Sequence, residues 1–102
     1  MIRHGALFRF REDVAHDEIT ALLAGYRELG NTVDGILDVA VGPNGSTEGL
    51  SKGFDHVIVI DFVDADAVEE YLSHPAHQAL ADRLIPCLDG GLEGSIPFDL
   101  SC

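Results

Sequence analysis

The third predicted strand, from Phe54 to Val63, constrains the fold most because both of its faces are apolar. Alternate residues of a strand point to opposite faces of a sheet, so its side chains divide into two sets. A strand with two apolar faces is predicted to lie in the middle of a sheet. One face carries His56, Ile58, Ile60 and Phe62, and the other carries Val57, Val59 and Val63.

The segments before this strand predict a strand, a helix and a second strand. Apolar residues alternate from Ile2 to Phe10 and then recur at three- and four-residue spacing up to Leu29, which predicts a strand followed by a helix. A further strand is expected from Gly35 to Val41. The glycine-rich stretch 42–53 is expected to be a long loop, which is either a connector or a flexible gate over a pocket.

The two segments after the third strand each contain a proline that indicates the local structure. Asp64 is expected to cap a helix that is interrupted at 73–75, where Pro75 suits the first position of a new helix. The last strand is expected from Leu92 to Leu100, and its Pro97 cannot donate to a ladder, which predicts an edge strand. The order β-α-β-β-α-β is typical of a ferredoxin-like split βαβ α+β fold, a four-stranded antiparallel sheet with helices on one face.

Helices can cover only one face of such a sheet, and this predicts self-association. An uncovered apolar face is a liability in a monomer, and a chain of 102 residues gains core by pairing. We therefore predict a homodimer formed through the sheet face, a dimeric α/β barrel. In a lone subunit, water is expected to reach Phe8 and Ile58.

The composition narrows the class of protein. With 18 acidic and 6 basic residues the net charge is -12, which disfavours binding to nucleic acid or to an anionic membrane. The two cysteines, Cys87 and Cys102, are expected to be reduced thiols. Because no signal peptide or membrane-spanning segment is recognisable, we expect one domain spanning residues 1–102 in the cytoplasm.

Tyr71 and His77 are the strongest candidates for chemistry. Each falls on the inward stripe of its helix, and the interruption between them could bring both towards one cavity. An imidazole and a phenol together can remove a proton and stabilise an oxyanion, which suits enolisation, aldol-type condensation or decarboxylation without a cofactor. The alternative is that the two are core residues that satisfy each other's hydrogen bonds.

The other histidines offer weaker signals. His4 and His56 each begin the inward-facing set of a strand, and we expect them side by side as polar pocket lining, with two ligands of a metal as the alternative. Asp55 and Asp61 are out of phase with His56, so neither completes a metal site, and no metal or cofactor is expected. His74 precedes Pro75 and suits a helix cap or a surface position.

Five segments together match the pattern of one family. They are 42–46 (GPNGS), 53–56 (GFDH), 61–62 (DF), 71–77 (YLSHPAH), and His4 with 8–10 (FRF). On these segments the chain resembles the stress-responsive A/B barrel (Dabb) domain family over nearly its whole length. The resemblance implies a dimeric α+β barrel, and many bacterial members of the family have no assigned activity.

The resemblance also implies a site. A plant polyketide-cyclising member of the family uses a Tyr and a His as its catalytic pair, and these match Tyr71 and His77 by motif. His4 and His56 match further positions that line the pocket. The expected substrate pocket comprises His4, His56, Phe8, Ile58 and His74.

Three functions remain open on the sequence. The first is a homodimer that binds a small apolar or aromatic molecule between helices and sheet. The second is a cofactor-free cyclase or lyase with His77 as base and Tyr71 as acid. The third is a stress-protective oligomer in which the assembly itself is the function.

Overall fold

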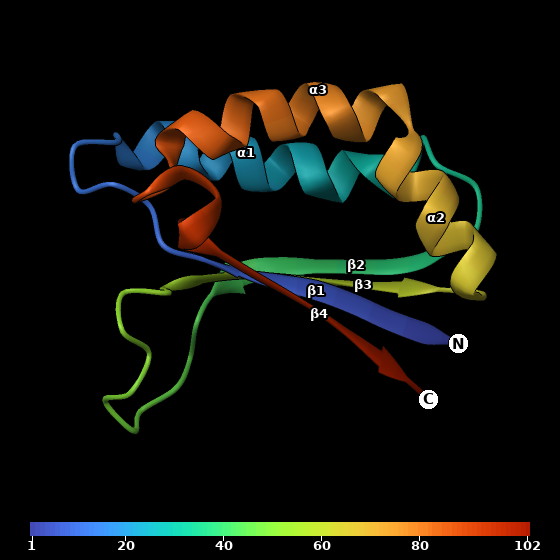
Figure 1. The fold of residues 1–102 in the computed structure, drawn as a ribbon, viewed down its shortest axis with the longest axis horizontal. Helices are drawn as coiled ribbons and strands as arrows, with labels where there is room; N and C mark the ends of the chain where they lie inside the picture. Colours follow the sequence, from blue (N-terminus) through green and yellow to red (C-terminus); the bar gives the residue numbers. More distant parts are fainter.

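The computed structural model describes all 102 residues, which form a four-stranded antiparallel sheet in the order β2-β3-β1-β4 with the helices on one face. Helices α1 and α3 run side by side above the sheet, and α2 descends towards it at one end (Figure 1). The predicted ferredoxin-like α+β fold and the central place of β3 are confirmed. The elements are β1 Ile2–Phe8, α1 His16–Leu29, β2 Ile36–Pro43, β3 His56–Phe62, α2 Ala65–Ser73, α3 Pro75–Leu84 and β4 Ser95–Ser101, with 3-10 turns η1 at Ile85–Cys87 and η2 at Gly91–Gly94.

The break between α2 and α3 is built from three predicted local signals. The Asp64 carboxylate accepts a hydrogen bond from the backbone N–H of Ala67 at 2.9 Å and so caps α2. His74 caps α3, since its Nδ1 accepts from the N–H of Ala76 at 3.0 Å, and Pro75 occupies the first helical position. The chain therefore changes direction between Tyr71 and His77 without losing helical structure on either side.

The last strand begins later than the sequence pattern predicted. It starts at Ser95 rather than Leu92, because Gly90 and Gly91 adopt left-handed backbone angles and lead into η2. Backbone hydrogen bonds tie both ends of this turn to Arg9, from Asp89 N–H to the Arg9 carbonyl and from Arg9 N–H to the Gly94 carbonyl. The strand pairs only with β1 and lies at the sheet edge, as Pro97 predicted.

Both faces of the sheet are apolar, but the prediction that Phe8 and Ile58 are exposed to solvent in a single subunit was wrong. Phe8 and Ile58 are each only 2% exposed, because they lie under the helices. The uncovered face carries the alternate set, in which Phe98 of β4 packs so closely over Gly5 that any Cβ there would overlap its ring. The apolar residues of this open face are Leu7, Val57, Val59, Ile96, Phe98 and Leu100.

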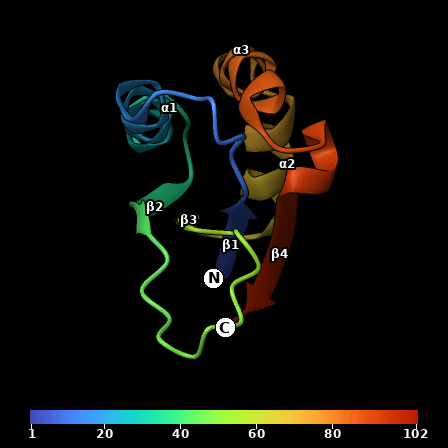
Figure 2. The same ribbon diagram turned by 90° about the vertical axis from the view of Figure 1, so that its left-hand side faces the viewer.

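The β2–β3 loop extends from one end of the sheet towards the open face, away from the helices (Figure 2). No helix of the fold combines the length and apolarity needed to cross a membrane.

Candidate functional site

A cavity of about 270 Å³ lies between the sheet and the helical layer, and the two predicted catalytic residues both line it. Its floor comes from β1 and β3, and its walls come from α1, α2, α3 and the segment around η2. Of its fifteen lining residues eleven are hydrophobic, so the space suits an apolar molecule. The polar or aromatic members are His4, Phe8, Tyr26, Tyr71, His77 and Ser95.

Tyr71 and His77 meet across the break between α2 and α3. Their ring centroids are 4.4 Å apart at an interplanar angle of 49°. Tyr71 is 1% exposed and His77 is partly exposed. The two rings are in van der Waals contact at the cavity wall, where the sequence pattern placed them.

Tyr71 and His77 do not hydrogen bond to each other, which differs from the structural alternative. Nδ1 of His77 is shut off from solvent and has no hydrogen-bond partner. A buried polar group without a partner costs free energy, so its presence in a native fold calls for an explanation. The unpaired Nδ1 of His77 is therefore a feature that the packing of the fold alone does not explain.

Burial sets the protonation states of the cavity. It lowers the pKa of His77, with the backbone of Leu72 opposing this shift and His4 adding to it, so the imidazole is neutral at neutral pH. Burial also raises the pKa of Tyr71, to which neighbouring Tyr26 contributes, and raises the pKa of Tyr26 to about 12. The site presents a neutral base beside protonated phenols.

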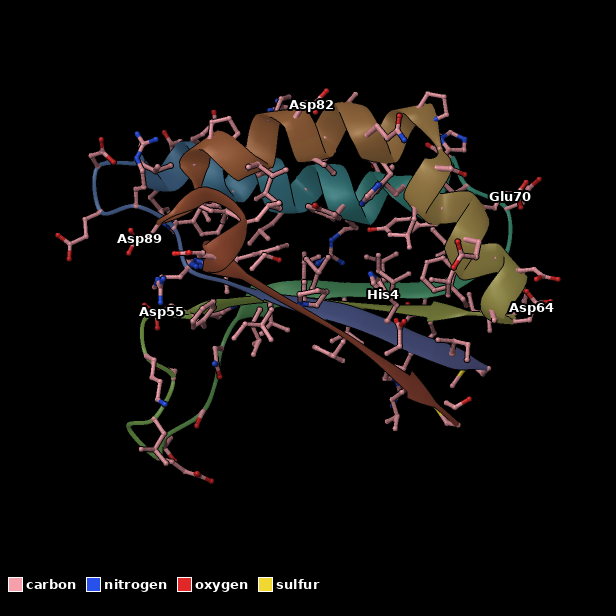
Figure 3. The ribbon with its side chains drawn as sticks, viewed as in Figure 1. His4, Asp55, Asp64, Glu70, Asp82 and Asp89 are labelled. Atoms are coloured by element: carbon pink, nitrogen blue, oxygen red, sulfur yellow. The ribbon has the colours of Figure 1, made fainter.

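An Asp–His pair completes the site, and the sequence analysis missed it. Nδ1 of His4 lies 2.6 Å from a carboxylate oxygen of Asp99 on the neighbouring strand β4. His4 is 8% exposed, and its ring meets the Tyr71 ring edge-on at 5.7 Å. Figure 3 shows His4 in the space between the sheet and the helices. A carboxylate at Nδ1 fixes the orientation of an imidazole and leaves Nε2 available.

The alternation of side chains along β4 already indicates which face of the sheet Asp99 occupies. It places Asp99 on the same face as Ser95 and Pro97, which both line the cavity, but the pairing with His4 depends on the strand register. Register is set by tertiary contacts, so the alternation alone did not identify the partner.

His56 does not join His4, contrary to the prediction. Strands β1 and β3 are antiparallel, so His4 pairs with Ile60 and His56 with Phe8, at opposite ends of the two strands. His56 packs edge-on against Phe10 at 5.3 Å, and burial lowers its pKa. The shared polar lining and the two-histidine metal site are both wrong, and no group of three or more potential metal ligands occurs in the chain.

Of the remaining predicted pocket residues, some line the cavity and one does not. Phe8 and Ile58 line the cavity, whereas His74 does not, because its ring nitrogen caps α3. No residue of the 42–53 loop lines the cavity either, so within one chain this loop does not gate it.

Comparison with known proteins places the fold in one family. Residues 2–100 match the family described as "Stress responsive A/B Barrel Domain". The chain is 32% identical over 88 residues to the stress-response A/B barrel domain-containing protein HS1 of Arabidopsis thaliana, covering 86% of this chain and 81% of HS1. It is 21% identical over 81 residues to olivetolic acid cyclase of Cannabis sativa, covering 79% and 80% of the two chains. Among solved structures, a dimeric ferredoxin-like protein of unknown function from Jannaschia sp. CCS1 superposes with a TM-score of 0.90 at 25% identity, covering 99% of this chain and 98% of that one.

Proposed function

Because the chain belongs to the stress-responsive A/B barrel domain family, we propose that it is a homodimer in which each subunit binds one small, largely apolar or aromatic molecule. The observation that carries this proposal is the apolar cavity with a neutral imidazole and a phenol in its wall that do not hydrogen bond to each other. Such a combination of apolar walls and few convergent polar groups is typical of small-molecule sites.

The open face of the sheet supports the dimer. Ile96, Phe98 and Leu100 of the edge strand are 46%, 39% and 55% exposed, and they continue an apolar surface across β1 and β3. A second copy seated on this face would remove it from water, and the Jannaschia protein with the same fold is described as dimeric. In such an assembly the helices and cavity of each subunit face outwards.

Binding is tested with 2-naphthol, an aromatic alcohol whose fluorescence reports its surroundings. We expect the wild-type protein to bind it with saturation, and the Ala81→Phe variant to lose affinity at least about tenfold because Ala81 lines the cavity. Ala79 lies on the same helix but outside the cavity, so Ala79→Phe is the matched control and should bind normally. Equal affinity in all three proteins would place the naphthol elsewhere and contradict the proposal.

Cofactor-free proton transfer is the second candidate function, and the lowered pKa of His77 favours it because the imidazole is left unprotonated. In this role Nε2 of His77 takes a proton from a carbon next to a carbonyl group. The electron pair of the broken C–H bond forms a C=C bond, and the π pair of the carbonyl group moves onto its oxygen. The hydroxyl of Tyr71 then donates a hydrogen bond to this developing enolate. Olivetolic acid cyclase, by its name a ring-forming enzyme, is a relative at 21% identity.

Exchange of the acidic hydrogens of phenylacetone with deuterium oxide, followed by NMR, tests this chemistry. A positioned base contributes about 10²- to 10⁴-fold, so wild type should accelerate exchange and His77→Ala should fall to the buffer rate. Tyr71→Phe keeps the ring that fills the core, and it should slow exchange by a larger factor than it weakens binding of 2-naphthol. If His77→Ala exchanged as fast as wild type, the enzyme candidate would be eliminated and the binding function would stand.

A further inference from the structure

The cavity has an apolar mouth and no cationic side chain in its wall. None of its fifteen lining residues is a lysine or an arginine. Leu72 and Leu92 line it while remaining 40% and 71% exposed, so they stand where the cavity meets solvent. A molecule that enters therefore passes apolar side chains and finds no positive charge inside.

The basic residues are used elsewhere in the fold. Two of the six, Arg27 in the last turn of α1 and Lys52 in the β2–β3 loop, do not line the cavity and form no ion pair. The other four face carboxylates in the pairs Arg3–Asp61, Arg9–Asp89, Arg11–Asp13 and Arg83–Glu18. The molecule as a whole carries a net charge of -12, and carboxylates such as Asp89 and Glu70 lie around its outside (Figure 3).

The histidines of the site do not replace the missing cation. His77 is partly buried beside Tyr71, in surroundings that favour its neutral form. His4 already faces the carboxylate of Asp99, so a negative charge lies beside its ring. An anionic ligand would lose its hydration on entering and gain no counterion.

We propose that this cavity selects uncharged aromatic alcohols over the corresponding carboxylates; this inference rests on the binding function proposed above. A hydroxyl group both donates and accepts, so it can pair with neutral His77 in either tautomer and with the hydroxyl of Tyr71. A carboxylate only accepts, and it adds a charge that the cavity does not balance. The substrate class is therefore neutral phenols and related alcohols.

Two probes with the same ring system test this selection at neutral pH, where 2-naphthol is neutral and 2-naphthoate is anionic. We expect the dissociation constant of 2-naphthoate to be at least about tenfold higher than that of 2-naphthol. Equal or tighter binding of 2-naphthoate would overturn the inference while leaving the pocket intact. Failure of both probes to bind would refute the binding function and the inference together.

Placing a cation at the mouth gives an independent test. Leu92→Lys adds a positive charge at an exposed position of the rim, so 2-naphthoate affinity should rise about tenfold and this gain should disappear in high salt. Leu50→Lys adds the same charge on the distant β2–β3 loop, at a residue that is 67% exposed, and should leave both affinities unchanged. If both variants improved 2-naphthoate binding equally, overall charge rather than the cavity would govern selection and the proposal would be wrong.

Discussion

Replacing Phe98 with alanine should weaken the proposed dimer without unfolding the subunit. Phe98 lies at the middle of the edge strand, and its ring covers Gly5 on the open face. In the single subunit 39% of the residue remains exposed, and this part is what a second sheet would cover. The substitution removes that apolar area from the interface and leaves the residues under the helices unchanged.

The expected loss follows from the exposed fraction. Full burial of a phenylalanine side chain is worth about 1.5–3 kcal/mol, so the uncovered part corresponds to about 1 kcal/mol in each subunit. A symmetric interface contains the residue twice, which brings the loss to about 1–2 kcal/mol for the dimer. The dissociation constant should therefore rise roughly five- to thirtyfold.

Sedimentation equilibrium over a range of protein concentrations measures this constant directly. Leu72→Ala is the matched control, because Leu72 is 40% exposed but belongs to the helical layer. Its dimer should dissociate as the wild type does. The reasoning would be refuted if wild type were monomeric at micromolar concentration, or if the two variants weakened the dimer equally.

Two further substitutions probe the helical layer that carries the site. The native state holds His77 with a pKa below its ordinary value near 6.5, so the unfolded chain binds a proton first as pH falls. The free energy of unfolding of wild type should therefore decrease below about pH 6.5. Urea unfolding at several pH values should show a smaller decrease for His77→Gln over the same range. His56, whose pKa is also lowered, remains in both proteins, and identical pH profiles would show that His77 does not contribute. Asp64→Ala removes the cap of α2 and should cost about 1 kcal/mol in the same urea assay, whereas Asp66→Ala within the first turn should cost less; equal losses would mean that the Asp64 cap is not the source.

Local chemistry determined most of what the sequence predicted correctly. The caps at Asp64 and His74 and the proline at position 75 depend on near neighbours in the chain, so their signals survive without tertiary information. The same holds for Pro97, whose missing N–H restricts its strand to an edge in any arrangement.

Long-range geometry accounts for the errors. The alternation of side chains divides a strand into two faces but does not say which face the helices cover. Phe8 was therefore expected on the solvent-exposed face. His4 lies near the start of β1 and His56 begins β3, so the antiparallel direction of these strands separates them. The partner of His4 is Asp99, and only the register of β4 on β1 brings the two within 2.6 Å.

The edge strand links the proposed assembly to the proposed site. Phe98 and Asp99 are consecutive, so one points to the open face and the other to His4. Because β4 pairs only with β1, a second subunit on its outer face would restrain the strand that positions the carboxylate.

Two coupled measurements follow from this arrangement. Dissociation of the dimer should weaken 2-naphthol binding, and by thermodynamic reciprocity 2-naphthol should tighten the dimer by the same factor. In Phe98→Ala the affinity for 2-naphthol should therefore fall as the protein is diluted below its dimer dissociation constant. An affinity independent of protein concentration in this variant would show that each subunit holds its site unaided, and the role assigned to the edge strand would be wrong.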